Sequence, residues 1–227
     1  MTRGFFVTGT DTGVGKTFVS LALMRAMQSQ GKRVAGMKPV ASGSQRSAAG
    51  LVNADALQLQ ARSSVRLPYE RINPYAFEPP IAPHLAAASA GAQIEIPVIE
   101  AAYRAVDHAA DSVIVEGVGG WLVPIGPRGT MADVAVALGL PVVMVVAIRL
   151  GCLNHALLTA AAVTGSGLRL AGWIANRIDP GCEKPDDIVG ALRVWLDAPL
   201  LADFVYQRDE RSAEPQVPQI DLALAAG

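Results

Sequence analysis

Runs of continuously apolar residues alternate along the chain with longer segments whose apolar positions recur every three to four residues. The continuous runs predict buried strands at 4–9, 33–38, 112–116, 141–148, 170–177 and 199–204. The periodic segments predict helices at 16–30, 53–61, 97–109, 131–138, 154–165 and 184–197, with Asn53 and Asn154 as N-caps. Such an alternation is typical of an α/β protein whose parallel sheet is covered by helices on both faces.

Two segments do not fit this alternation. Residues 66–84 are rich in proline and predict an irregular segment, whose length for a loop favours a functional role. From about residue 207 the chain is polar and predicts a loosely held tail. No internal repeat, low-complexity tract or linker interrupts the rest, so we expect residues 1–227 to form a single domain.

Composition and charge narrow the class of protein. Hydrophobic residues make up 51% of the 227 positions, which is enough for one sizeable α/β core. The 19 basic and 20 acidic side chains give a net charge of −1. Without a basic excess, we expect neither nucleic acid nor a membrane as a partner.

The cysteines and the longest apolar run indicate the compartment. Cys152 and Cys182 are isolated and lack the spacing of a zinc site, which favours a reducing environment. The N-terminal residues lack the apolar stretch of a signal peptide. The longest uncharged run, 134–148, is broken by glycine and proline and is too short to span a bilayer. We therefore expect a soluble, cytoplasmic protein.

Polar residues follow the predicted strands where each strand ends. They are 8–17 after the first strand, Lys38 and Ser42 after the second, then Glu116, Arg149 and Asn176 after later strands. In open parallel sheets, ligands bind at the carboxyl ends of the strands. The sequence therefore predicts that these side chains meet at one edge of the sheet and form the active site.

The segment "GTDTGVGKT" at 9–17 ends as a phosphate-binding P-loop ends, but it is one residue longer than the usual pattern. A strand, a glycine-rich turn and a helix starting at Lys16 are the required context, which favours a P-loop over a hairpin with a chance G-K-T. Backbone N–H groups and the helix N-terminus would hold phosphate oxygens. Lys16 would reach the β and γ phosphates, and the Thr17 hydroxyl would bind Mg²⁺.

Three further charged residues are candidates for chemistry. Glu116 stands where P-loop proteins hold a magnesium carboxylate, although a solvated loop acid is the alternative. Lys38 could neutralise charge on a transferred phosphoryl group, although alone it would most often be a surface lysine. Asp55 is, without further context, an acid in the first turn of a helix, where the helix dipole favours it.

Six blocks in one order resemble the dethiobiotin synthetase family: "FVTGTDTGVGKT", "KPVASGS", "NADAL", "VEGVGGW", "LGCLNHALLT" and "LAGWIAN". The resemblance runs from Phe6 to about Ile178 and includes the long spacing before Gly15. The block "PPIAPH" at 79–84 is similar to the proline-rich substrate loop of the family. The resemblance implies a P-loop NTPase-like fold and an ATP-dependent ring closure of 7,8-diaminononanoate with CO₂, through a carbamate and a carbamic-phosphoric anhydride.

The resemblance also implies roles for individual residues. The catalytic residues would be Lys38, Lys16 and Thr12, and the magnesium ligands Thr17, Asp55 and Glu116. ATP would contact Gly13, Val14, Gly15, Lys16, Thr17, Phe18, Asp55, Glu116, Gly117, Val118, Gly119, Asn176 and Arg177. The diamine or its carbamate would contact Thr12, Ser42, Gly151, Cys152 and Asn154. The longer loop would bend Thr12 toward this substrate, and Asn176 would contact the adenine.

The family resemblance implies a homodimer with shared active sites. The substrate carboxylate would bind the N-terminus of the helix at "GCLNH" in the partner subunit. Within that block Cys152 suits ordinary packing better than nucleophilic chemistry, and His155 suits a structural role better than catalysis.

The sequence departs from the family pattern at three places. Position 13 is glycine where family members carry glutamate, and position 149 is arginine where they carry lysine, which keeps the charge but changes its geometry. After Leu201 the "G-x-I-P" run that frames the adenine has no counterpart. The sequence therefore predicts neither the adenine and ribose contacts beyond Asn176 nor a strict preference for ATP.

Two other classes share parts of this pattern. A glutamine-dependent cobyrinate amidase would need an added glutaminase domain, for which this chain has no room. A nucleotide switch of the chromosome-partitioning type commonly has a second lysine in its P-loop, where this chain has threonine and glycine. Nucleotide hydrolysis that ignores the diamine would indicate a switch.

Overall fold

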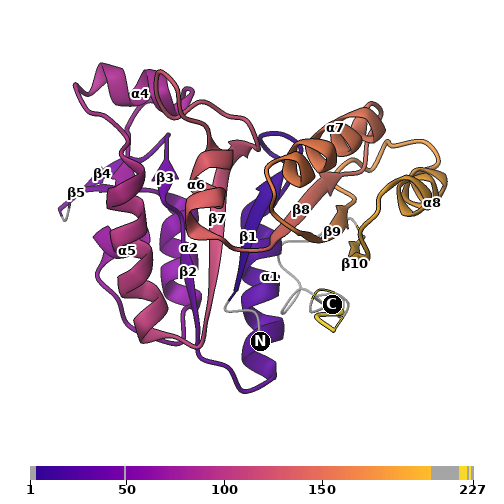
Figure 1. The fold of residues 1–227 in the computed structure, drawn as a ribbon, viewed down its shortest axis with the longest axis horizontal. Helices are drawn as coiled ribbons and strands as arrows, with labels where there is room; N and C mark the ends of the chain where they lie inside the picture. Colours follow the sequence, from indigo (N-terminus) through magenta and orange to yellow (C-terminus); the bar gives the residue numbers. More distant parts are fainter. Residues whose placement is uncertain (1–3, 49, 206–219, 224, 226–227) are drawn as a thin grey trace.

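The computed structural model describes residues 4–48, 50–205, 220–223 and 225. Its centre is a six-stranded sheet in the order β10-β9-β8-β1-β7-β2, in which every paired strand is parallel (Figure 1). The strands are β1 (Gly4–Gly9), β2 (Val34–Met37), β7 (Ser112–Gly120), β8 (Val142–Ala147), β9 (Leu170–Asn176) and β10 (Leu200–Phe204). The predicted α/β fold with a parallel sheet is confirmed.

Helices cover both faces of this sheet. On β1, Phe5 and Val7 pack with α1 (Lys16–Ser29) and α2 (Ala54–Arg62), because alternate side chains of a strand point to the same face. Phe6 points to the other face, toward α5 (Ile96–Ala109) and α6 (Met131–Leu138). The same alternation along β8 places α7 (Cys152–Gly165) and α8 (Pro185–Trp195) on the Phe6 face. Trp121, which follows β7, is buried edge-on against Phe6.

The proline-rich stretch 66–84 is more ordered than expected. It contains α3 (Tyr69–Ile72), β6 (Tyr75–Ala76) and the start of α4 (Pro83–Ser89), so the expectation of an irregular segment is wrong. β6 pairs with β3 (Val40–Ala41), and a separate hairpin joins β4 (Gln45–Ser47) to β5 (Gly50–Val52). Asn73 fastens this stretch to the end of β2 by donating from Nδ2 to the Lys38 carbonyl at 2.7 Å.

Three boundaries differ from the sequence expectations. Strand β7 continues past Glu116 to Gly120, so Glu116 lies within the strand. Helix α7 begins at Cys152 with Gly151 as its N-cap, so the assignment of Asn154 as the cap is wrong. The expected tail lies outside the described residues from 206 to 219, but Ile220 and Ala225 are buried in the core beside α1, which the polar pattern did not predict.

Among the described helices, none is long and apolar enough to cross a bilayer.

Candidate functional site

The segment between β1 and α1 folds as a compact loop at the carboxyl end of the central strand (Figure 1). Gly9 must lack a side chain, because a Cβ there would lie 2.6 Å from Val14 Cγ2 and 2.9 Å from the Asp11 carbonyl oxygen. Gly13 and Gly15 have φ angles of 74° and 89°, which glycine adopts without strain. The glycines therefore let a loop with five residues between Gly9 and Gly15 curl back on itself before the helix starts.

Asp11 forms hydrogen bonds that hold this loop in its folded conformation. Its carboxylate Oδ1 accepts the Thr12 N–H at 2.7 Å, and its carbonyl oxygen accepts a hydrogen bond from Lys16 Nζ at 3.0 Å. Thr12 lies beside the end of β7, since a Cβ on Gly119 would be 3.6 Å from the Thr12 hydroxyl oxygen. The loop thus brings Thr12 and Lys16 to the same edge of the sheet.

Lys16 is almost fully buried at the start of α1. Burial and, after it, the positive charge of Lys38 lower its pKa to about 8, although the charges of Glu116, Asp55 and Asp11 act in the opposite direction. An anion near Nζ would restore the charged form, because an opposite charge favours it. The Lys16 ammonium is therefore suited to binding a phosphate group.

Lys38, Asp55, Glu116 and Thr17 form one cluster, in which Lys38 and Glu116 are buried and Asp55 and Thr17 are partly exposed. Lys38 Nζ lies against Glu116 Oε1 and donates to Asp55 Oδ2 at 2.7 Å, and the Thr17 hydroxyl donates to Glu116 Oε1 at 3.0 Å. Burial alone would lower the pKa of Lys38, but the charges of Glu116 and Asp55 and their hydrogen bonds raise it above its ordinary value. Lys38 is therefore a charged lysine fixed at the predicted site, and it is not a surface lysine.

Glu116 is not a solvated loop acid, since its side chain is fully buried in β7. Its Oε2 atom has no hydrogen-bond partner among the described residues, and a buried carboxylate oxygen without a partner is costly. Asp55 reaches the cluster from the first turn of α2, where Asn53 caps the helix by accepting from Asp55 N at 3.1 Å and from Ala56 N at 3.3 Å. The Asn53 cap is thus confirmed, and it also positions Asp55.

Asn176 is the last residue of β9, and Arg177 follows it. Asn176 Nδ2 donates to the Val14 carbonyl at 2.8 Å, and a Cβ on Gly15 would lie 2.1 Å from this nitrogen. One N–H of the Asn176 amide is therefore already bound to the loop. Arg177 forms a two-point ion pair with Asp203, at 2.8 Å and 2.6 Å, and also contacts Asp186 at 2.8 Å.

The predicted substrate residues lie on two elements. Ser42 follows β3, and its carbonyl accepts from Asn53 Nδ2 at 3.3 Å. Gly151, with a φ of 90°, turns the chain into α7. The Cys152 N–H donates to the Arg149 carbonyl at 3.1 Å, so it is not free for a ligand, and the Cys152 side chain is buried in the core beside α7. This leaves Leu153 and Asn154 as the first-turn residues of α7 whose N–H groups the helix itself does not bond.

Phe18, Gly117 and Val118 complete the predicted nucleotide residues. Phe18 is partly exposed and packs edge-on against Phe204, with ring centroids 5.2 Å apart. Gly117 and Val118 continue β7 beyond Glu116. A Cβ on Gly117 would lie 3.2 Å from the ring of Phe6, so the strand is closely packed there.

The sequence hypothesis placed Asp11 and Arg149 at this edge of the sheet but gave neither an individual role. Asp11 binds Thr12 and Lys16, and Arg149 Nη2 donates to Asp11 Oδ2 at 2.9 Å. An acidic side chain inside a loop that is predicted to bind phosphate was the one sequence signal for a partner cation. The hydrogen bond from Asn73 to the Lys38 carbonyl was not indicated by the sequence, because Asn73 lies in the proline-rich stretch that was expected to be irregular.

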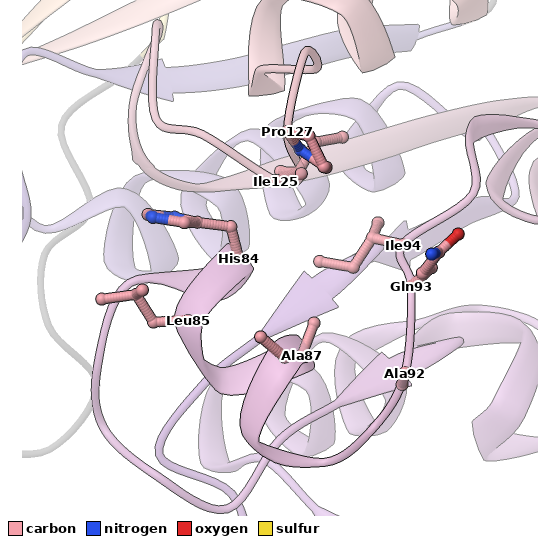
Figure 2. Close-up of a pocket in the computed structure, with 10 residues that line it drawn as sticks. His84, Leu85, Ala87, Ala92, Gln93, Ile94, Ile125 and Pro127 are labelled. Carbon is pink, nitrogen blue, oxygen red and sulfur yellow. The ribbon is translucent and has the colours of Figure 1, made fainter.

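A separate pocket of 420 Å³ lies between α4 and residues 125–127. Figure 2 shows His84, Leu85 and Ala87 from α4 on one side and Ile125 and Pro127 on the other. None of the predicted site residues lines it, and its lining is largely apolar and contains no carboxylate or lysine. The pocket therefore lacks the groups that the predicted phosphate chemistry requires.

Comparisons with known proteins agree on a family. The chain matches a family model described as an AAA domain over residues 3–209. It is 52% identical over 199 residues to the ATP-dependent dethiobiotin synthetase BioD of Aromatoleum aromaticum, covering 88% of each chain. It is 44% identical over 224 residues to the ATP-dependent dethiobiotin synthetase BioD 1 of Escherichia coli strain K12, covering 99% of this chain and 100% of that one.

Solved structures with a similar backbone are more distant in sequence. The septum site-determining protein MinD of Pyrococcus horikoshii has a TM-score of 0.58 at 16% identity, covering 89% of this chain and 81% of that one. The signal recognition particle receptor FtsY of Elizabethkingia anophelis has a TM-score of 0.52 at 17% identity, covering 99% of this chain and 64% of that one. At such identities the likeness shows the fold alone, which is that of P-loop NTPases.

Proposed function

The chain belongs to the ATP-dependent dethiobiotin synthetase family, and on that premise we propose that it converts 7,8-diaminononanoate, CO₂ and ATP into dethiobiotin. The main structural support for this proposal is one observation. Lys16 and the cluster of Lys38, Asp55, Glu116 and Thr17 lie at the same edge of the sheet. Two buried cations beside two carboxylates suit a reaction that moves a phosphoryl group between oxygens.

The proposed reaction has three bond-forming steps. A neutral amine of the diamine attacks CO₂ and, after losing a proton, becomes a carbamate. A carbamate oxygen then attacks the γ-phosphorus of ATP, ADP leaves, and a carbamic-phosphoric anhydride remains. The second amine attacks the carbamoyl carbon, phosphate leaves, and the cyclic urea closes with loss of a proton.

The residues of this chain supply charge and position for these steps. Lys16 would bind the β and γ phosphates, and Lys38 would stabilise the negative charge on the carbamate and on the transferring phosphoryl group. Thr12, held beside Gly119, would orient the carbamate. Burial of both lysines strengthens their interaction with an anion, because the local dielectric constant is lower than that of water.

We also infer that Thr17, Asp55 and Glu116 hold Mg²⁺. The donors are a hydroxyl and two carboxylates, which are the hard oxygen ligands that Mg²⁺ prefers. Glu116 Oε2, buried and without a partner among the described residues, supports a cation at this place. When bound, Mg²⁺ would supply charge neutralisation for the ATP phosphates.

The homodimer belongs to the same proposal. Gly151 is the N-cap of α7, and the N–H groups of Leu153 and Asn154 in the first turn would be available to bind a carboxylate. Leu150, next to this turn, is 98% exposed in the single chain. A partner subunit bound at the proposed carboxylate site would cover this side chain.

A product assay tests the proposed function. The protein would be incubated with 7,8-diaminononanoate, ATP, Mg²⁺ and isotope-labelled bicarbonate, and the products analysed by mass spectrometry. We expect labelled dethiobiotin, with ADP release that requires the diamine. ADP release at the same rate with and without the diamine, and no dethiobiotin, would instead indicate a nucleotide switch ATPase.

Replacing Glu116 by glutamine should expose the role of its charge. Glu116→Gln keeps the volume and the oxygen atom but removes the negative charge that would hold Mg²⁺. We expect kcat to fall about thirtyfold and the Mg²⁺ concentration for half-maximal rate to rise about tenfold. Glu78→Gln is the matched control, since Glu78 pairs with Arg46 at the surface. An unchanged Mg²⁺ dependence in Glu116→Gln would show that Glu116 is not a magnesium ligand.

Lys38 contacts the same carboxylates that are proposed to bind Mg²⁺, so the ammonium and the metal should compete. Lys38→Met removes the competing charge at similar volume. We expect Mn²⁺, used as a spectroscopic substitute and titrated without nucleotide, to bind about tenfold more tightly to Lys38→Met than to the wild type. Lys184→Met, at an exposed lysine, should leave Mn²⁺ affinity unchanged. Equal or weaker binding by Lys38→Met would mean that Lys38 and the metal do not share these oxygens.

A further inference from the structure

One residue of the predicted phosphate loop has a hydrogen-bond partner outside the loop. Asp11 is the second of the five residues between Gly9 and Gly15, and the two oxygens of its carboxylate make different contacts. Oδ1 accepts the N–H of Thr12, and Oδ2 accepts from Arg149 Nη2 at 2.9 Å. The carbonyl of the same residue holds Lys16 Nζ at 3.0 Å. Asp11 therefore joins the proposed phosphate cation, the proposed substrate residue and Arg149.

Arg149 is in turn fixed between two elements. It directly follows Ile148, whose N–H donates to the Asn176 carbonyl at 2.9 Å, so its backbone continues from the sheet. Its carbonyl accepts the Cys152 N–H at 3.1 Å and thereby starts α7. One residue thus contacts the phosphate loop through its side chain and the first turn of α7 through its backbone.

We propose that Arg149 is a positioning residue for the reaction, acting through Asp11 to set where Lys16 and Thr12 stand relative to ATP and the carbamate. The inference rests on the proposed function of the site and adds a residue that makes no contact with the reacting groups itself. The pair Arg149–Asp11 is about half exposed, at 41% and 48% of the side chains, and exposed ion pairs add little to stability. Its effect should therefore appear in the kinetics and in nucleotide affinity, because small displacements of a catalytic group cost large factors in rate.

A double-mutant cycle tests this inference. Arg149→Met removes the guanidinium, and Asp11→Asn removes the charge of the partner while keeping an oxygen for the Thr12 N–H. We expect each change to lower kcat/KM for ATP about tenfold and to raise the Kd of a fluorescent ATP analogue several-fold. The double variant should be no worse than either single variant, because both break the same contact. Arg149→Lys, which keeps the charge, should recover most of the loss.

The chain offers a matched control in a second exposed ion pair. Arg33 and Asp111 are bonded at 2.7 Å with side chains 60% and 45% exposed, between the start of β2 and the start of β7. Arg33→Met and Asp111→Asn should leave kcat/KM and nucleotide Kd unchanged. All variants should melt within a few degrees of the wild type, so a general loss of folding cannot imitate the result.

Three outcomes would overturn the inference. If Arg149→Met had wild-type kinetics and nucleotide affinity, the contact between Arg149 and Asp11 would not position Lys16 or Thr12. A double variant about a hundredfold down, the product of the singles, would show that Arg149 and Asp11 act independently. A loss confined to melting temperature would show a structural role only. If the wild type forms no dethiobiotin, the proposed function fails, but the same cycle on nucleotide Kd still decides the role of Arg149.

Discussion

Lys16→Met should form dethiobiotin at less than about a thousandth of the wild-type rate, because the only buried cation of the described loop would be lost where the phosphates bind. Methionine has a similar length and no charge, so it can fill the same buried space at the start of α1. It also removes the repulsion between Lys16 and Lys38 that lowers the pKa of Lys16. The folded state should therefore keep its melting temperature or gain slightly while the reaction stops.

The measurement combines product formation, nucleotide binding and thermal unfolding on the same preparation. Lys184→Met is the control, since that side chain is 81% exposed and pairs only loosely with Asp187 at 4.0 Å. It should retain wild-type kinetics. Undiminished dethiobiotin formation by Lys16→Met would refute the assignment of residues 9–17 as a phosphate-binding loop.

Two inactive variants should restore each other if the active sites are shared between subunits. The first is Lys16→Met, which disables the phosphate half of a site. The second is Asn154→Asp, which places a negative charge at the proposed carboxylate site. An acid in the first turn of a helix is favourable, so α7 should form normally. With the diamine below its KM, we expect Asn154→Asp to react about thirtyfold more slowly, because the two carboxylates repel.

Mixing the two variants by unfolding and refolding together would give mixed dimers as half of the total. In a mixed dimer, one site combines both defects and the other combines the two intact halves. We therefore expect about a quarter of the wild-type activity in the mixture, far above either parent. A mixture that forms dimers but stays as inactive as its parents would place the carboxylate site within one chain.

A complementary mixture makes the test sharper. The double variant Lys16→Met/Asn154→Asp is refolded with an equal amount of wild type. With shared sites every mixed dimer is inactive, and only wild-type dimers contribute, at about a quarter of full activity. With sites confined to single chains, each mixed dimer keeps one working site and the total is about a half. Shared sites therefore predict about equal activities for the two mixtures, whereas single-chain sites predict almost no activity for the first mixture and about a half for the second.

Local patterns predicted the elements that carry the chemistry. The apolar run of β1, the glycines and the start of α1 at Lys16 are adjacent in sequence, so their arrangement follows from backbone preferences alone. The meeting of Lys38 and Glu116 followed from a general property of parallel sheets, since both residues lie toward the carboxyl ends of neighbouring strands β2 and β7. The nucleotide, metal and substrate roles of these residues stay predictions.

The features that sequence analysis missed depend on contacts between distant residues. Asp11 and Arg149 are separated by 138 positions, and no local pattern pairs them. Asparagine often caps helices, so Asn154 was a reasonable N-cap to predict. In the structure Gly151, with its positive φ, is the N-cap, and α7 therefore starts two residues before Asn154. The order in 66–84 comes from packing and from the bond of Asn73 to Lys38, which proline content does not indicate. The burial of Ile220 and Ala225 likewise depends on tertiary packing.

The strand order has a consequence for how the protein is made on the ribosome. Strand β1 is synthesised first, but it pairs only with β7 and β8 in the described sheet, where Phe6 lies opposite Val115 and Val142. Strand β2, the next to emerge, is separated from β1 by β7. Within the first half of the nascent chain, β1 and β2 therefore have no neighbour in the central sheet and must wait for β7 and β8. Such long-range pairing slows folding and exposes the nascent chain to chaperones and to aggregation during translation.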